Sequence, residues 1–241
     1  MEKDITGWRA KIGLLLPSVN SVVEPWFYGV APKGVSFHSS RMLLEKAGGV
    51  AGIERMIENS FRAAREVASV PVDLVVYCCT AGTLVKGPAF DDQLIQRLKS
   101  ETGIPSITAT GSIIKAFQRF QVKKIVIAGP YTRDIDELEK KYFEESGFEV
   151  LNIQGMNLQA SDLDKPSPEE IYRFAQKSWN DKADCLLLSC LNFRAQACIE
   201  ALERDLQKPV FTSVQAVLWN LLRVMDIQDP ISGYGKLLSS P

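Results

Sequence analysis

The sequence predicts an α/β protein of two similar α/β lobes with parallel four-stranded sheets related by pseudo-twofold symmetry, with the active site in the cleft between them. Short runs rich in Val, Ile and Leu alternate with amphipathic stretches along the 241 residues. The runs are apolar on both faces, which is typical of parallel strands covered by helices on both sides. The order of the segments also repeats once at a nearly constant offset, which indicates two lobes.

Eight runs have the length and composition of strands. They are residues 11–17, 35–41, 74–79, 106–110, 124–129, 149–154, 185–190 and 210–213. Helical spacing is found between them, for example in 53–68, 137–146 and 194–206. In the first of these stretches Ile53, Ile57, Phe61 and Ala64 fall on one face, so we expect that face to be buried.

The two halves of the chain contain the same motifs in the same order. KIGLLLPSVN resembles KIVIAGPYTR, and DLVVYCCTAGT resembles DCLLLSCLNFR; in both halves a Pro, a short strand, a Thr and a helix follow. The pairs Ile12/Ile125, Cys79/Cys190 and Pro105/Pro209 are 113, 111 and 104 residues apart. We therefore expect an N-terminal lobe over residues 1–120 and a C-terminal lobe over 121–241. The last helix of 214–241 could also pack on the first lobe.

The composition is that of an ordinary globular protein, with a formal net charge of −1 and 46% apolar residues. No basic run suggests a nucleic-acid partner. The apolar runs are too short to span a bilayer, and MEKDITGWRA lacks the apolar centre of a signal peptide. We expect a cytoplasmic protein that binds a small carboxylate, with no nucleic-acid or membrane partner. The apolar stretch 214–225 fits either the core or the interface of a homo-oligomer.

Cysteine and histidine usage narrows the chemistry. The five cysteines are an odd number without C-x-x-C spacing, so we expect neither a disulfide framework nor a metal site. The single histidine, His38, lies on the alternating strand 35–41, where a role as catalytic base is disfavoured. Cys79 and Cys190 end equivalent strands, and ligands of such sheets bind at the carboxyl ends of strands. The symmetry would direct both sulfurs toward one point in the cleft.

Packing is the alternative explanation for a cysteine beside a buried strand. Cys185 and Cys198 have no counterpart in the other half, so we expect both to be packing residues. Cys78 and Cys79 alternate along the strand, so we expect only one of them to face the cleft.

The segments IGLLLPSVNSVVE, FHSSRM, CCTAGT and the later SC, taken in order, resemble the maleate cis-trans isomerase and arylmalonate decarboxylase family of the aspartate/glutamate racemase superfamily. The resemblance covers the whole chain, and PSVN…E with HSSRM favours the maleate isomerase branch. It implies Cys79 and Cys190 as the catalytic residues. The substrate contacts that it implies are Pro17, Asn20, Thr80, Ala81, Tyr131 and Leu191. Asn20 and Tyr131 could instead cap the helices that follow them.

One loop departs from the pattern. Isomerases similar to this chain have an Asn before the helix that opens SPEEIY, whereas Ala160 or Ser161 occupies that position here and Asn157 is displaced. We therefore expect one carboxylate contact fewer than in those isomerases. Arg41 is a positive charge that could bind a dicarboxylate or form an ion pair, and we leave it unassigned.

The resemblance implies a cofactor-independent cis-trans isomerase of a small unsaturated dicarboxylate, of the maleate-to-fumarate type. A Cys79 thiolate would add to one alkene carbon, and rotation followed by expulsion would give the trans product, without metal, flavin or nucleotide. Cys190 would donate or accept a proton. A free thiol has a pKa of about 8.5, so we expect backbone amides of the turn after Cys79, at a helix N-terminus, to favour the thiolate.

Three alternatives remain open. A two-cysteine racemase of a small carboxylic acid or hydantoin would use the same thiols as an acid/base pair. An arylmalonate-type decarboxylase is disfavoured, because the resemblance implies a single cysteine for that branch. A metabolite-binding protein without turnover would retain binding when both cysteines are changed to Ala.

Overall fold

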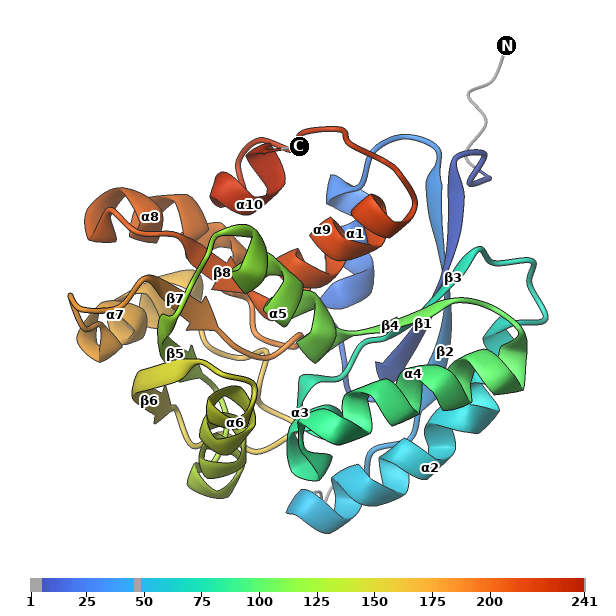
Figure 1. Cartoon of the computed structure of the whole chain (residues 1–241), viewed down its shortest axis with the longest axis horizontal. Coiled ribbons are helices and arrows are strands. Elements are labelled where there is room, and N and C mark those ends of the chain that lie inside the picture. The colour runs from blue at the N-terminus through green and yellow to red at the C-terminus, as the bar shows by residue number, and fades with distance from the viewer. Residues whose placement is uncertain (1–5, 46–48, 241) are drawn as a thin grey trace.

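Two parallel sheets lie side by side in the computed structural model, which describes residues 6–45 and 49–240 (Figure 1). The ends of the predicted lobes, residues 1–5 and 241, lie outside the described residues. The first sheet has the strand order β2-β1-β3-β4 and the second has β6-β5-β7-β8, with every pairing parallel. The strands are β1 (Ala10–Pro17), β2 (Val35–Met42), β3 (Leu74–Tyr77), β4 (Ser106–Thr108), β5 (Lys124–Gly129), β6 (Glu149–Gly155), β7 (Cys185–Leu188) and β8 (Val210–Thr212). All eight predicted strands are present and the predicted fold class is confirmed.

Helices connect the strands and cover the sheets. In the first half they are α1 (Val23–Val30), α2 (Gly49–Val67), α3 (Thr80–Lys86), α4 (Pro88–Thr102) and α5 (Ala109–Arg119). In the second half they are α6 (Arg133–Glu145), α7 (Pro168–Ser178), the 3₁₀ helix η1 (Ala195–Cys198), α8 (Ile199–Leu206), α9 (Ser213–Val224) and α10 (Gly235–Ser239). The predicted inner face of α2 is buried.

The repeated Thr after the fourth strand of each sheet has the same role in both lobes. The Thr108 hydroxyl accepts a hydrogen bond from the Gly111 amide at the start of α5, and the Thr212 hydroxyl accepts one from Gln215 at the start of α9. Such caps satisfy amides that have no partner within the first helical turn. The sequence repeat is therefore also a repeat of local structure.

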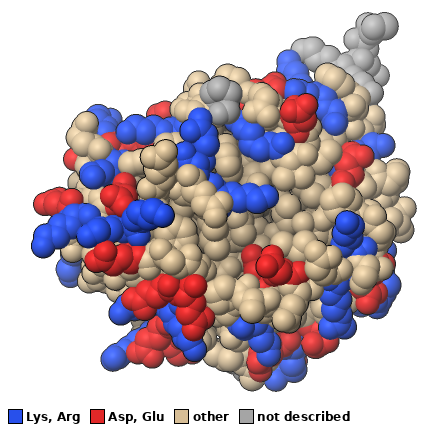
Figure 2. Space-filling model, in the orientation of Figure 1, with Lys and Arg blue, Asp and Glu red and all other residues tan. Residues whose placement is uncertain are grey.

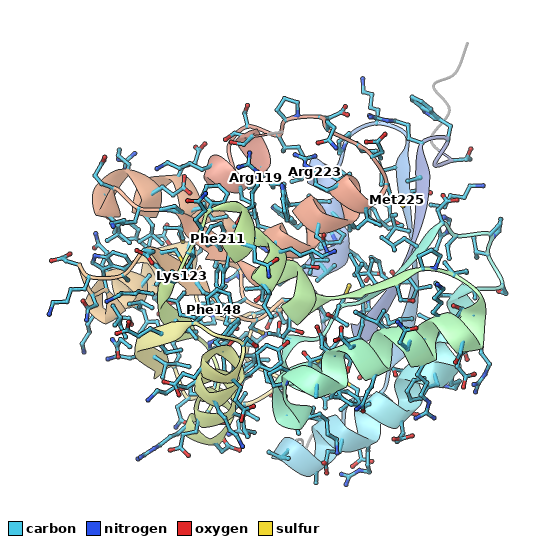
Figure 3. All side chains as sticks on the ribbon, in the orientation of Figure 1. Arg119, Lys123, Phe148, Phe211, Arg223 and Met225 are labelled. Atoms are coloured by element: carbon cyan, nitrogen blue, oxygen red, sulfur yellow. The ribbon has the colours of Figure 1, made fainter. Side chains whose placement is uncertain are left out.

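The two lobes meet where α5 lies beside α9. The buried Asn220 side chain on α9 donates to the Ser112 hydroxyl on α5 at 3.0 Å. Under α5, Phe117 makes edge contacts with Phe148 and Phe211, which come from the second lobe (Figure 3). Residues 213–222 of α9 are all buried, so most of the apolar stretch 214–225 is core. The final helix α10 packs on α8, α9 and β8.

Charges of both signs are interspersed on the face shown in Figure 2, with acidic side chains gathered over α6. A positive groove of the kind that follows a nucleic-acid backbone is not seen on this face. Within the described residues, every helix is too short or too polar to cross a membrane.

Candidate active site

A cavity of about 330 Å³ lies between the lobes, at the carboxyl ends of β1, β3, β5 and β7. Loops that leave parallel strands at this edge bring together residues far apart in sequence, which is where such sheets bind ligands. All eight residues predicted for the site line this cavity: Pro17, Asn20, Cys79, Thr80, Ala81, Tyr131, Cys190 and Leu191.

Cys79 follows β3 and immediately precedes α3. Its side chain is 7% exposed, and the backbone amides of Gly82 and Ala81 both donate toward its sulfur. The Tyr77 hydroxyl lies beside the same sulfur. Burial raises the pKa of Cys79 to about 11, and the two amides and the nearby phenol each act to lower it.

Cys190 follows β7 in the other lobe and has fewer donors. The Asn192 amide donates to its sulfur at 3.3 Å, and the Tyr131 hydroxyl lies beside it. Burial raises the pKa of Cys190 to about 12, against the effect of these two donors. The backbone φ of Cys190 is 90°, in a region unfavourable for a residue with a side chain, and its amide is held by the Ser213 hydroxyl. Strain of this kind is often found at functional sites.

The expected preference for thiolate is therefore not met in the free protein. Burial outweighs the donors at both cysteines, because a charged sulfur loses more solvation in the cavity than the donors return. At Cys190 the charges of Cys79 and Glu139 also act to raise the pKa. The addition chemistry thus requires a proton to leave Cys79 when substrate binds.

Neutral donors surround the two sulfurs. The side-chain oxygen of Asn20 caps α1 by accepting hydrogen bonds from the backbone amides of Val22 and Val23. No described residue accepts from the side-chain N–H groups of Asn20. The Thr80 hydroxyl is buried and has no hydrogen-bond partner among the residues that the structure describes. Asp134, exposed at the rim, is the single charged residue among the described lining residues. A carboxylate would therefore be held by amides and hydroxyls.

Arg41 stabilises the loop that presents the first of these donors. Its guanidinium pairs with Glu24 and donates to the Asn20 backbone carbonyl at 2.7 Å. Arg41 does not line the cavity, so it belongs to the scaffold of the site.

Sequence reasoning missed Asn192, which joins the two lobes at the cavity. Its side-chain oxygen accepts from the Ser21 amide at 2.9 Å, and its side-chain nitrogen donates to the Val19 carbonyl at 3.3 Å. The same residue supplies the amide that donates to Cys190. The position of an Asn immediately after a predicted catalytic loop was the available signal.

The other cysteines and the single histidine differ in their position relative to the cavity. Cys78 borders the cavity but is fully buried, whereas Cys79 is 7% exposed, so which of the two side chains faces the cleft stays a prediction in favour of Cys79. Cys185, Cys198 and His38 do not line the cavity, in agreement with packing roles for the two cysteines.

Ala160, one of the two residues predicted to replace the expected Asn, lines the cavity, whereas Ser161 does not. Neighbouring parts of the wall are apolar and include Ile53, Met56, Leu158 and Leu163. Ala160 itself offers no side-chain donor here, and the neighbouring Gln159 is the residue with a side-chain amide on this wall.

Comparison with known proteins is consistent with this site. The maleate isomerase of Pseudomonas putida is 26% identical over 95% of this chain and 97% of its own. The structure of the maleate isomerase Iso from Pseudomonas putida S16 superposes with a TM-score of 0.89 at 25% identity, covering 95% of this chain and 98% of that one.

A cysteine mutant of the Nocardia farcinica maleate cis-trans isomerase, described with a covalently bound succinylcysteine intermediate, superposes with a TM-score of 0.91 at 22% identity, covering 95% of this chain and 98% of that one. The sequence profile of the family described as arylmalonate decarboxylase matches residues 12–238. Because that match includes both lobes and both cavity cysteines, the chain belongs to the arylmalonate decarboxylase family, as its motifs predicted.

Proposed function

We propose that this chain is a cofactor-independent cis-trans isomerase of a small unsaturated dicarboxylate of the maleate type, with Cys79 as nucleophile. The observation that carries the proposal is the convergence of two thiols from opposite lobes on one cavity lined by neutral donors. The curated relatives named maleate isomerase support the enzyme class, since four of them match 95% of this chain.

The reaction uses side chains alone. The Cys79 thiolate forms a C–S bond with one alkene carbon, and the π electrons move to the neighbouring carbon and its carboxylate as an enediolate. The former double bond is then single and rotates. The electron pair returns, the C–S bond breaks, and the trans isomer leaves with the thiolate regenerated, so the reaction has no net oxidation or reduction.

The residues around Cys79 suit this charge movement. Asn20, Thr80 and Tyr131 are donors for the substrate carboxylates and for the enediolate that develops during addition. Loss of one such donor typically costs about 3 kcal/mol of transition-state stabilisation. Cys190, on the opposite wall, gives a proton to the second carbon of the enediolate, which forms the succinyl thioether, and takes that proton back before the electron pair returns and the C–S bond breaks.

The proposal predicts fumarate in the proton NMR spectrum when the purified protein is mixed with maleate and no cofactor. Cys79→Ala should lower the rate by at least about 10³-fold, because the nucleophile is lost. Cys198→Ala is the matched control, since that cysteine is buried outside the cavity and should leave the rate within about twofold.

Mass spectrometry of the quenched reaction separates addition from proton exchange. A succinyl adduct on the Cys79 peptide supports addition. Solvent deuterium at the α-carbon of a saturated acid, without an adduct, would replace the isomerase by the two-cysteine racemase. Undiminished binding without turnover would instead favour the metabolite-binding alternative.

A further inference from the structure

Tyr77 is a buried phenol whose hydroxyl has no obvious structural role. It is the last residue of β3, its side chain is 0% exposed, and its hydroxyl has no hydrogen-bond partner among the described residues. A buried hydroxyl without a partner destabilises a fold, so Phe would serve packing better at this position.

The surroundings of this hydroxyl are shaped to hold it next to the nucleophile. A Cβ at Gly82 would lie 2.1 Å from the Tyr77 oxygen, so a larger residue there would displace the phenol. The hydroxyl lies beside the Cys79 sulfur, on the side away from the cavity, since Tyr77 itself does not line the cavity.

Asp91 is the other titratable group that acts on Tyr77 among the described residues, and its carboxylate already accepts two hydrogen bonds. Its two carboxylate oxygens accept from the hydroxyls of Thr108 and Thr110 at 2.9 and 3.0 Å. Asp91 acts on Tyr77 through its charge alone, whereas the Cys79 sulfur lies within reach of the Tyr77 hydroxyl.

The second lobe has the corresponding arrangement, with the Tyr131 hydroxyl beside the Cys190 sulfur. The two phenols come from different elements, because Tyr77 ends β3 whereas Tyr131 follows β5. We infer that Tyr77 donates a hydrogen bond to the Cys79 thiolate during turnover, so that each thiol has its own phenol donor. This inference rests on the proposed function for its role in catalysis, but the contact itself can be tested without any substrate.

The experiment compares wild type with Tyr77→Phe by the rate of iodoacetamide alkylation at each cysteine, followed by peptide mass spectrometry from pH 7 to 9. Thiolate is the reacting form, so a weaker donor lowers the alkylation rate. We expect alkylation of Cys79 to slow about tenfold, an upward pKa shift of about one unit, while Cys190 in the same molecules is unchanged. Tyr131→Phe should give the reverse pattern.

The design separates the possible outcomes. Equal rates at Cys79 in wild type and Tyr77→Phe would overturn the inference, whatever the substrate proves to be. Local unfolding would speed alkylation of both cysteines instead of slowing one. Gly82→Ala is a second variant that displaces the phenol while leaving the amide of residue 82 in place, and it should slow Cys79 in the same way.

Turnover adds a readout specific to chemistry. Because Tyr77 lies behind Cys79 and outside the cavity wall, Tyr77→Phe should lower kcat for maleate about tenfold and leave KM unchanged. A rise in KM at constant kcat would contradict a role through the sulfur. If maleate is not a substrate, the alkylation rates still decide whether the contact exists.

Discussion

Cys79 and Cys190 occupy equivalent positions in the two lobes, but the groups around them differ. Cys79 has two backbone amides and a phenol, whereas Cys190 has one amide and a phenol. Both pKa values, about 11 and about 12, lie above the ordinary thiol value because both sulfurs are buried. The charges of Cys79 and Glu139 also act to raise the pKa of Cys190, whereas two amides act to lower that of Cys79. The larger number of donors around Cys79 supports it as the nucleophile of the proposed reaction.

Ala160 is the cavity residue at which this chain departs from the pattern of the similar isomerases. It lines the cavity where an Asn is expected, and its methyl group donates no hydrogen bond. Ala160→Asn should raise kcat/KM for maleate by about tenfold or more, because a hydrogen bond to a charged group contributes about 1.5–3 kcal/mol. Initial rates of fumarate formation measure this change.

Ser161→Asn is the matched control, because residue 161 does not line the cavity. It should leave kcat/KM for maleate unchanged. Equal rates for Ala160→Asn and wild type would mean that the second carboxylate is bound elsewhere, or that the native substrate has an apolar group at this end.

The sequence predicted the site residues that lie next to strand ends. It did not predict those whose role depends on contacts with the other lobe. Cys79, Thr80 and Tyr131 follow apolar strands, so the repeat and the resemblance could select them. Asn192 gains its importance from contacts with Val19 and Ser21, which lie more than a hundred residues away in sequence. Periodicity carries no information on such contacts.

At the scale of elements, strand existence was predictable and strand ends were not. β3 and β7 each end two residues before the cavity cysteine, at Tyr77 and Leu188. Both predicted runs continued to the cysteine because it is apolar and buried. Hydrophobicity does not show where ladder hydrogen bonds stop, and these bonds define the strand end.

Helix α6 buries a carboxyl group that the mechanism does not use. Glu139 is 0% exposed and accepts a hydrogen bond from the Ser189 hydroxyl, next to Cys190. Its second carboxyl oxygen has no hydrogen-bond partner within the described part of the chain. Burial raises the pKa of Glu139 to about 8, and Asp136 on the same helix also acts to raise it. The folded protein therefore holds Glu139 protonated at neutral pH.

This protonation predicts a pH dependence of stability. Between the unfolded pKa, about 4.3, and the folded pKa, about 8, the native state binds a proton that the unfolded state does not. The stabilising contribution is complete below the unfolded value and is lost as pH rises through the folded value. The free energy of unfolding should therefore fall by up to about 1.4 kcal/mol per pH unit between pH 5 and 8 from this group.

Urea titrations at a series of pH values measure that slope. Glu139→Gln keeps the shape and cannot ionise, so its slope should be shallower than in wild type, with the contribution of Asp136 remaining. Glu137→Gln, an exposed change on the same helix, should keep the wild-type slope. Parallel pH profiles for Glu139→Gln and wild type would show that Glu139 ionises in the folded protein as it does in the unfolded chain.

Across the whole molecule, the sequence predicted two lobes but not how firmly they are joined. The sequence repeat defines each sheet separately. The junction depends on the α5–α9 packing, the Asn220–Ser112 hydrogen bond and the ion pair of Arg9 with Asp229, none of which is periodic. Because the cavity is formed by both lobes, this junction also fixes the separation of the two thiols.

The extent of the junction predicts that the lobes unfold together. Differential scanning calorimetry should give one transition, with equal calorimetric and van't Hoff enthalpies. Asn192→Ala, which removes the side chain that joins the loops at the cavity, should lower the free energy of unfolding by about 1 kcal/mol and keep a single transition. It should also lower kcat/KM, since the loop bearing Asn20 is no longer held against the loop bearing Cys190.

Asn59→Ala provides the matched control, because that side chain is half-buried on α2 and, among the described residues, bonds to the Arg55 carbonyl of its own helix. It should change neither kcat/KM nor the number of transitions. Two separated transitions in wild type would mean that each lobe is an independent folding unit. The separation of Cys79 from Cys190 would then vary with the relative motion of the lobes, and the cavity would form only when substrate draws them together.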